Sequence, residues 1–393
     1  MKMNRLISGT ILCLCALSMQ AQWVSQTSGT QTDLYAVRFV TENNGIIAGD
    51  NGMILSTSNG GTTWTQRVSG TTENLNAVCY LHPDTALIAG YSGVILKTTD
   101  GGLNWTSLNS GSIRHLTSLF FINADTGYAA GESGEVLKTT NGGNTWSKLT
   151  TGTTQYLHGI YFTNADTGYI VGNSGTIIKT TNGGTSWASL SSSTTASLYS
   201  VWFIDNQNGF SAAYDGNIVK TVNAGQTWTS IPANMIGPVT SLYFTQAGIG
   251  YAVGVVGTIL QSTNAGSNWN TQQCSTTEVL QSVFFVNEQT GWCVGQKGTI
   301  LKTLNGGVAN INEQIKNDFG VYPNPAKTEV RIDLPEITAS RTELTDLSGK
   351  MVFSDASITE APYLLNLSDF QKGLYLIKVV GATFQKTKLL IIE

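Results

Sequence analysis

The sequence predicts an all-β protein, a seven-bladed β-propeller followed by a C-terminal Ig-like β-sandwich. Three observations lead to this prediction: a repeat of constant length, four short apolar runs in each repeat, and a tail in which the repeat stops. Tryptophans recur every 41 residues, and a period of this length indicates stacked supersecondary units. They stand at positions 23, 64, 105, 146, 187, 228 and 269.

The pattern inside one repeat favours strands over helices. Residues 116–149 contain four short apolar runs, which are separated by turn residues such as Gly131–Gly134 and the glycine pair after Asn141. Helical pairs also fit a period of this length, but runs this short and interrupted are typical of strands. Four strands in each repeat predict an antiparallel blade.

The first strand of each repeat is apolar on both faces, which predicts burial between two neighbouring blades. An aromatic residue occupies its sixth position in every repeat, and the fifth position is often aromatic too. Large aromatic side chains are suited to the wedge-shaped gaps between blades. The sixth-position residues are Phe39, Tyr80, Phe121, Phe162, Phe203, Phe244 and Phe285.

The corner that precedes each tryptophan is predicted to be architectural. An Asn or Asp there can accept hydrogen bonds from backbone N–H groups just ahead and close an Asx turn, and the following glycines allow positive φ. Because each polar group then has a local partner, we expect no catalytic or metal site in these corners. The corner residues are Asn59, Trp64, Asp100, Trp105, Asn141, Trp146, Asn182, Trp187, Asn223, Trp228, Asn264, Trp269 and Asn305.

These corners resemble the Asp-box, or BNR repeat, of sialidase-type propellers. The third repeat matches it at Thr139, Asn141, Gly143, Thr145 and Trp146, with Asn in place of Asp. Six of the seven corners carry this Asn. The resemblance covers residues 22–310, and the repeats are most similar to propellers of the photosystem II assembly and stability factor family, which also occur in non-photosynthetic bacteria.

The seventh repeat lacks its own last strand. It reaches the corner at Asn305, but no tryptophan follows. Residues 22–29 parallel residues 63–70, which lead into the second repeat. We therefore expect residues 22–29 to supply the outer strand of the seventh blade, since this would remove an open sheet edge.

Residues 1–21 are predicted to be a signal peptide. Lys2 and Arg5 precede a short apolar stretch, and Ala21 offers a cleavage site. The stretch is too short for a membrane anchor, and no later segment is long and apolar enough.

The net charge of −4 gives no basic field for nucleic acid. Cys79, Cys274 and Cys293 remain in the mature chain as expected free thiols, with a Cys274–Cys293 bridge as the alternative.

The tail follows a linker, residues 311–317, and spans residues 318–393. Alternating strands and a terminal apolar strand predict a small β-sandwich. Its Tyr322–Pro325 motif, Gly373–Tyr375 and the strand at 386–391 resemble the type A C-terminal sorting domain of type IX secretion. The resemblance implies the type IX machinery as a partner and an extracellular or outer-membrane-surface location. An ordinary C-terminal binding domain is the alternative.

The candidate binding surface is the rim opposite the corners. There, glycine-framed turns between second and third strands vary in their middle residues, and loops between blades add further side chains. We expect this rim to bind an unknown surface protein or a glycan, although simple solvated turns would look the same. The candidate rim residues are Asp50, Tyr91, Arg114, His115, Glu132, Tyr156, Asn173, Tyr214, Asp215 and Gln296.

No coherent catalytic set emerges from the sequence, so we expect a non-catalytic protein without cofactor or metal. The three propeller arginines occupy unrelated positions, which excludes a sialidase. A glycoside hydrolase with a carboxylate pair, Asp50 and Asp215, is the alternative function. The three histidines lack metal-ligand spacing, and the recurring third-strand lysines are interpreted as solvated strand ends. Arg38 replaces an aromatic residue and either reaches the central channel or extends to water.

Overall fold

The computed structural model describes residues 23–233, 235–307, 319–333, 339–346, 349–356, 362–381 and 385–393. The predicted signal peptide and the predicted linker lie outside these residues. The chain divides into two compact units, Met1–Val308 and Ala309–Glu393. All regular elements of the described residues are strands or single 3-10 turns.

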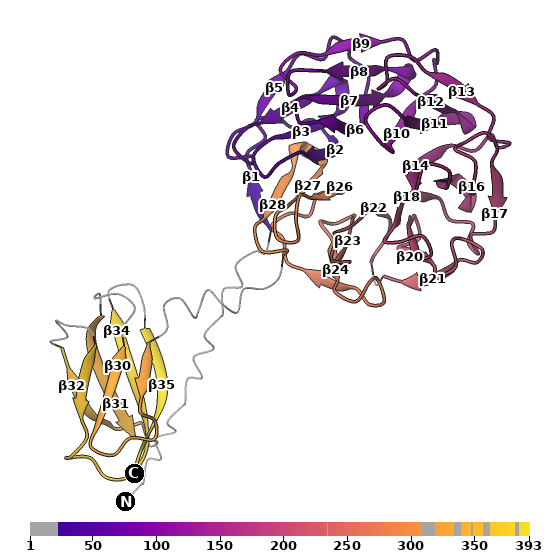
Figure 1. The fold of residues 1–393 in the computed structure, drawn as a ribbon. Coiled ribbons are helices and arrows are strands. Elements are labelled where there is room, and N and C mark those ends of the chain that lie inside the picture. The colour runs from indigo at the N-terminus through magenta and orange to yellow at the C-terminus, as the bar shows by residue number, and fades with distance from the viewer. Residues whose placement is uncertain are drawn as a thin grey trace, which may run out of the picture. The chain divides into compact units, whose positions relative to one another are not determined.

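The first unit contains seven four-stranded antiparallel sheets, and these sheets form a ring (Figure 1). Six of them use four consecutive strands. The first three are β2 (Leu34–Phe39), β3 (Gly45–Gly49), β4 (Ile54–Thr57), β5 (Thr65–Arg67); β6 (Leu75–His82), β7 (Thr85–Gly90), β8 (Ile95–Thr98), β9 (Thr106–Leu108); and β10 (Leu116–Phe121), β11 (Gly127–Gly131), β12 (Val136–Thr139), β13 (Ser147–Leu149). The next three are β14 (Leu157–Phe162), β15 (Gly168–Gly172), β16 (Ile177–Thr180), β17 (Ala188–Leu190); β18 (Leu198–Phe203), β19 (Gly209–Ala213), β20 (Asn217–Thr221), β21 (Thr229–Pro232); and β22 (Val239–Phe244), β23 (Gly250–Gly254), β24 (Ile259–Ser262), β25 (Asn270–Gln272).

The seventh sheet joins the two ends of this unit. It has the order β1 (Val24–Gln26), β28 (Ile300–Thr303), β27 (Gly291–Gly295) and β26 (Leu280–Phe285). Trp23, next to β1, is fully buried and packs edge-on against Phe285 at 5.6 Å between ring centroids. Its indole N–H donates to the side chain of Gln272 in the sixth sheet.

The apolar cores lie between adjacent sheets. The first strand of each repeat, from β2 to β26, is innermost in the ring (Figure 1). The strand that follows it is buried throughout, except for Thr85 at the start of β7. Sixth-position aromatic residues stack on second-strand residues of the preceding sheet, as Phe162 does on Tyr128 at 4.2 Å. One expectation for the innermost strands was wrong. Their second and fifth residues are not buried but partly exposed along the axis of the ring.

The second unit contains two sheets that share one apolar core. The three-stranded sheet has the order β29 (Gly320–Tyr322), β30 (Glu329–Asp333), β33 (Tyr363–Asn366); the four-stranded sheet has the order β32 (Met351–Asp355), β31 (Ala339–Asp346), β34 (Gly373–Gly381), β35 (Gln385–Ile392). Val330 and Leu365 of the first sheet and Leu344, Ile377 and Leu390 of the second sheet are buried in the same cluster.

Two observations on the described residues concern membranes and cysteines. None of their helices has the length and apolar character needed to cross a membrane. Cys79, Cys274 and Cys293 are free thiols, so the alternative Cys274–Cys293 bridge is not formed. Burial raises the pKa of the Cys79 thiol to about 11, which keeps this thiol protonated at neutral pH.

Candidate binding face

The corners use their polar groups on one another. In the third sheet, the Thr139 hydroxyl accepts from the Gly143 N–H at 3.0 Å and donates to Asn141 Oδ1. Asn141 Oδ1 also accepts from the Thr145 N–H, and Asn141 Nδ2 donates to the Thr145 hydroxyl. Trp146 packs edge-on against Phe121. This set uses both lone pairs of the Asn141 oxygen and one of its two N–H donors within the corner itself.

The third-strand lysines connect neighbouring sheets, which corrects their interpretation as solvated strand ends. Each is half-buried. The ammonium groups of Lys97, Lys138, Lys179 and Lys302 donate to a corner carbonyl of the next sheet, and that of Lys220 lies over the Phe210 ring. Lys138 reaches Gly183 O and Lys302 reaches Gly60 O, both at 2.8 Å. Gln261 takes this role in the sixth sheet, where its side chain donates to Gly306 O.

The opposite edge of the ring is built from turns of constant backbone and variable side chains. Five of these turns are 3-10 turns: η1 (Asp50–Gly52), η2 (Tyr91–Gly93), η3 (Glu132–Gly134), η4 (Asn173–Gly175) and η5 (Gln296–Gly298). The Gly134 N–H donates to Gln155 O in the loop before the next sheet. A Cβ on Gly134 would lie 1.9 Å from Thr153 O, so only glycine fits there. The backbone thus holds the first turn residue, here Glu132, in a set position.

The turn of the fifth sheet differs from this pattern, whereas the turn of the sixth sheet keeps the backbone bonds but presents valine. In the fifth sheet, the Asp215 carboxylate accepts from the Asn217 N–H, and Gly216 has a φ of 82°. Tyr214 of this turn is 57% exposed. In the sixth sheet, Val256 takes the positive φ and is 63% exposed, so this stretch of the rim is apolar without an aromatic side chain.

Candidate rim residues of the second and third sheets meet in one cluster. Tyr91 stacks on His115 at 4.0 Å between ring centroids, and His115 Nδ1 accepts from the Ser92 N–H. Arg114 forms an ion pair with Glu132 at 3.7 Å. The other Glu132 carboxylate oxygen accepts from the His115 N–H. The charged groups of this cluster are therefore paired, and the flat faces of Tyr91 and His115 dominate it.

A second cluster continues the first across the fourth and fifth sheets. Burial raises the pKa of Tyr156 to about 12, with smaller contributions from Tyr91 and Glu132 and a hydrogen bond with Tyr91. Tyr156 stacks on His158 at 4.9 Å, and His158 contacts Tyr199 edge-on at 5.0 Å. We call the combined row the aromatic band. Its members are Tyr91, His115, Tyr156, His158, Tyr199 and Tyr214.

Two members of this band, His158 and Tyr199, were not among the predicted rim residues. Each is the second residue of its innermost strand, and His158 Nε2 hydrogen-bonds Asn173 Oδ1 at 2.8 Å. Burial lowers the pKa of His158, so the neutral ring prevails at neutral pH. A signal was present in the sequence, because the same position holds Tyr35 in the first sheet.

The remaining candidates do not join the band. The Asp50 carboxylate accepts a hydrogen bond from the Tyr35 hydroxyl at 2.7 Å, and burial together with this bond raises the pKa of Tyr35. Asp215 is exposed and serves its own turn. Gln296 belongs to the seventh sheet, at η5. No contact between Asp50 and Asp215 appears among the described residues, so the hydrolase alternative gains no support.

Comparison with known proteins shows which family this ring of sheets belongs to. Residues 16–114 and 111–259 match the family model described as photosynthesis system II assembly factor YCF48. The chain belongs to the YCF48 family. Residues 320–393 match the model of the secretion system C-terminal sorting domain, while none of the curated proteins matches the chain.

Solved structures confirm that the YCF48-family part is a β-propeller. One similar structure is "YCF48 bound to D1 peptide", with 19% identity and a TM-score of 0.63, covering 75% of this chain and 100% of that chain. Another is YCF48 from Cyanidioschyzon merolae, with 19% identity and a TM-score of 0.60, covering 72% and 98%. The WD40 propeller domain of Doa1 follows at 13% identity and a TM-score of 0.61, covering 71% and 94%.

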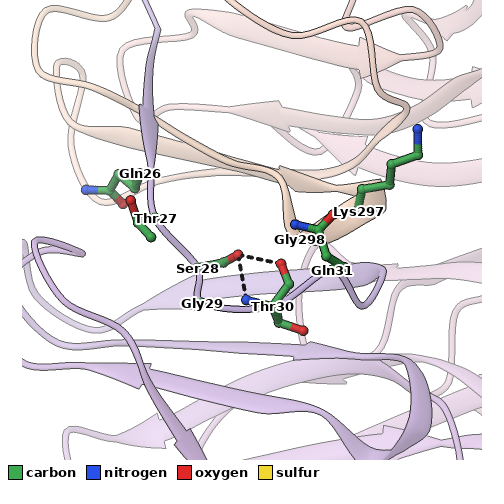
Figure 2. A pocket seen from close by; sticks show the side chains of 8 residues that line it. All are labelled: Gln26, Thr27, Ser28, Gly29, Thr30, Gln31, Lys297 and Gly298. Carbon is green, nitrogen blue, oxygen red and sulfur yellow. Dashed lines mark hydrogen bonds between the residues drawn. The ribbon is translucent and has the colours of Figure 1, made fainter.

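One hollow on this YCF48-family propeller has few reactive side chains. It has a volume of about 380 Å³, lies beside the joint of the seventh sheet and is lined by residues 26–31, Lys297 and Gly298 (Figure 2). Lys297 points away from the other lining residues, and its ammonium group pairs with Glu278 at 2.9 Å. The Ser28 hydroxyl is bonded to the Thr30 backbone. No carboxylate, histidine or cysteine side chain lines this hollow, so none of its hydroxyl groups has a general base beside it.

In the sorting domain, the Tyr322–Pro325 motif is hydrogen-bonded to the last strand, β35. Asn324 Oδ1 accepts from the Ile391 N–H at 2.9 Å, and Asn324 Nδ2 donates to Leu389 O at 2.7 Å. Ala326 forms a parallel bridge with Ile392. The Asn324 side chain thus pairs with β35 as a neighbouring strand would, and covers part of an otherwise open sheet edge.

Proposed function

We propose that this protein is an exported, non-catalytic propeller that binds an extended peptide segment of a partner protein on its aromatic band. The observation behind this proposal is the band itself: six flat side chains from four adjacent sheets lie in contact, and the charges beside Tyr91 and His115 are paired. Aromatic side chains provide large contact area at low entropic cost, and they are frequent anchors in protein interfaces. A YCF48 relative bound to a peptide supports this ligand class.

The domain layout supports the export part of the proposal. We infer seven blades over residues 22–310, with residues 22–29 closing the seventh blade, since β1 pairs with β28. Residues 318–393 are inferred to be an Ig-like β-sandwich that engages the type IX secretion machinery, because two sheets share its core and the sorting-domain model matches. Residues 1–21 are proposed to be the signal peptide, and the mature protein reaches the extracellular side or the outer-membrane surface.

The binding experiment uses the mature chain, residues 22–393, on peptide and glycan arrays. We expect selected peptides to bind, and the double variant Tyr91→Ala/His115→Ala to weaken this binding about tenfold or more, as loss of a stacked anchor does. Val68→Ala is the matched control because Val68 is 86% exposed on the outside of the ring. Binding to glycans alone, or equal loss in the control, would contradict a peptide-binding band.

Two further measurements test the rest of the proposal. A chain lacking residues 318–393 is expected to stay inside the outer membrane, whereas the full chain is released or displayed. If the protein turns over a glycan, and Asp50→Asn or Asp215→Asn abolishes this turnover, the non-catalytic assignment is wrong. The glycoside hydrolase alternative is then correct.

A further inference from the structure

The axis of the propeller is lined by two layers of side chains. The second and fifth residues of each innermost strand supply these layers, and all fourteen are partly exposed. Solvent therefore reaches both layers. The fifth-position layer consists of Arg38, Cys79, Phe120, Tyr161, Trp202, Tyr243 and Phe284.

The aromatic members of the fifth-position layer form a continuous wall. Ring centroids lie 5.2 Å apart for Phe120 and Tyr161, and 5.2 Å apart for Tyr161 and Trp202. Trp202 and Tyr243 are separated by 4.7 Å, and Tyr243 and Phe284 by 5.3 Å. Five of the seven sheets thus present an aromatic face to the axis at this level.

Arg38 interrupts this wall with a positive charge. Its guanidinium lies over the Phe284 ring at 5.4 Å. Its Nη1 donates to Val37 O at 2.8 Å, a carbonyl of its own strand. No carboxylate among the described residues forms an ion pair with it; the ionisable groups that influence it are the Cys79 thiol and the Tyr243 hydroxyl. Burial raises the pKa values of both groups, so both are neutral at pH 7.

The Arg38 guanidinium is therefore a partly buried cation that, among the described residues, bonds only to Val37 O and has no counter-charge. Burial lowers the pKa of this guanidinium, which reflects the cost of removing the charge from water. A bound anion would offset that cost, because a charge inside a protein is tolerated when it is paired. This differs from Arg114 on the rim, which already has Glu132 as its partner.

We propose that Arg38 anchors a ligand site on the propeller axis, and that this site takes a carboxylate carried on a flat apolar group. The planar guanidinium matches a carboxylate in a two-bond geometry. A single Arg balances one negative charge, which favours a carboxylate over a phosphate dianion. The neighbouring Phe284, Tyr243 and Trp202 rings supply apolar surface for the body of the ligand.

The carboxylate can belong to a small molecule or to the end of a peptide, and two probes separate these sources. Benzoate represents the small molecule. A short peptide ending in phenylalanine, with a free C-terminal carboxylate, represents the peptide, and the same peptide as its amide is its control. Binding is measured by calorimetry on the mature chain, residues 22–393.

We expect saturable one-to-one binding of benzoate, or of the free-carboxylate peptide, and binding weaker by about tenfold or more for benzyl alcohol or the peptide amide. Arg38→Phe, which introduces the residue found at the equivalent positions of the third and seventh sheets, is expected to abolish this preference. Arg38→Lys keeps the positive charge but loses the planar two-bond geometry of the guanidinium, so an intermediate affinity is expected. Melting curves of both variants verify their folding.

The matched control is Arg67→Leu, which removes an arginine of the outer strand β5. Failure of both carboxylate probes to bind would overturn the proposal. So would binding that Arg38→Phe and Arg38→Lys leave unchanged, or that Arg67→Leu weakens equally. Tyr91→Ala/His115→Ala is expected to leave this site intact, so the outcome is independent of the aromatic band.

Discussion

The turns at the two edges of the propeller are held by different bonds, by side-chain hydrogen bonds at the corner edge and by backbone hydrogen bonds at the rim edge. At the corner edge, the same side chains make the same bonds in sheet after sheet: a Thr or Ser hydroxyl accepts from the N–H of the glycine four residues on, as at Thr57, Thr139 and Ser262. At the rim edge, the turns repeat backbone bonds, since Gly131 and Gly172 each donate to the carbonyl four residues on. The repeated side-chain bonds there come from the neighbouring loops, where the Ser69 and Ser192 hydroxyls donate to the carbonyl two residues on.

This difference teaches where such a scaffold can carry specificity. A corner that depends on side-chain bonds cannot exchange those side chains freely. A rim turn that depends on backbone bonds and one glycine leaves its first residue free to be Asp50, Tyr91 or Glu132. The aromatic band is one product of that freedom.

Loss of Trp23 is expected to produce the largest effect, because this residue completes a corner across the joint of the ring. Trp23→Ala should lower the free energy of unfolding by about 3–5 kcal/mol, the range for a fully buried large aromatic residue. Urea denaturation of the mature chain measures this change. Val24→Ala, at the next residue and the first of β1 but 62% exposed, is the control. Equal small losses in both variants would mean that β1 does not hold the seventh sheet.

Gly134 and Glu132 test the rim edge directly. Gly134→Ala should cost about 2–4 kcal/mol, because the new Cβ meets Thr153 O and the φ of 72° strains alanine. Glu132→Ala in the same turn should change stability by less than about 0.5 kcal/mol, yet weaken partner binding. Thermal unfolding and the peptide array give the two readouts. If the two variants lost the same stability, the rim would depend on its side chains as the corners do.

Thr139 tests the corner edge in the complementary way. Thr139→Val keeps the shape of a fully buried side chain but leaves the Gly143 N–H without its acceptor. The expected loss of unfolding free energy is about 1–2 kcal/mol. Ser147→Ala is the control, since its exposed hydroxyl bonds only to Lys138 O. A Thr139→Val variant as stable as this control would show that the corner bonds are redundant.

The repeated parts of the fold could be predicted from the sequence, whereas the site could be predicted only in part. The 41-residue period locates every strand and corner, because each is defined by residues close in the chain. Tyr91 and His115 were candidates because they stand in a turn and a loop. His158 and Tyr199 were missed because a strand position does not show whether its side chain meets a neighbour 41 residues away.

Contacts across sheets were harder to predict for the same reason. Lys138 meets Gly183 only because the ring places one third strand beside the next corner. Gln26 and Gln272 accept from the indole N–H groups of Trp64 and Trp23 on either side of the joint. The indole N–H groups of four other corners have no such acceptor among the described residues: Trp105, Trp187, Trp228 and Trp269. Periodicity alone does not reveal this distinction.

The smallest expected effect concerns Asp100, the one carboxylate among the seven corners. Hydrogen bonds from the Asn104 backbone and side chain and from Thr98 lower its pKa from the ordinary 3.8 to about 2. A carboxyl group whose pKa is lowered by folding contributes stability above its unfolded pKa and loses it as the pH falls through the folded value. The contribution of Asp100 should therefore be complete above about pH 4 and decline toward pH 2.

Asp100→Asn removes this ionisation and installs the residue of the other six corners. Urea unfolding midpoints of wild type and Asp100→Asn, measured from pH 5 to pH 2, are expected to converge as the pH falls. The reciprocal variant Asn141→Asp, in a corner with the same Thr–Asn–Gly–Gly arrangement, should acquire the pH dependence that Asp100→Asn loses. Parallel pH profiles for all three proteins would show that the corner does not discriminate carboxylate from amide, and that its repeated bonds depend on shape alone.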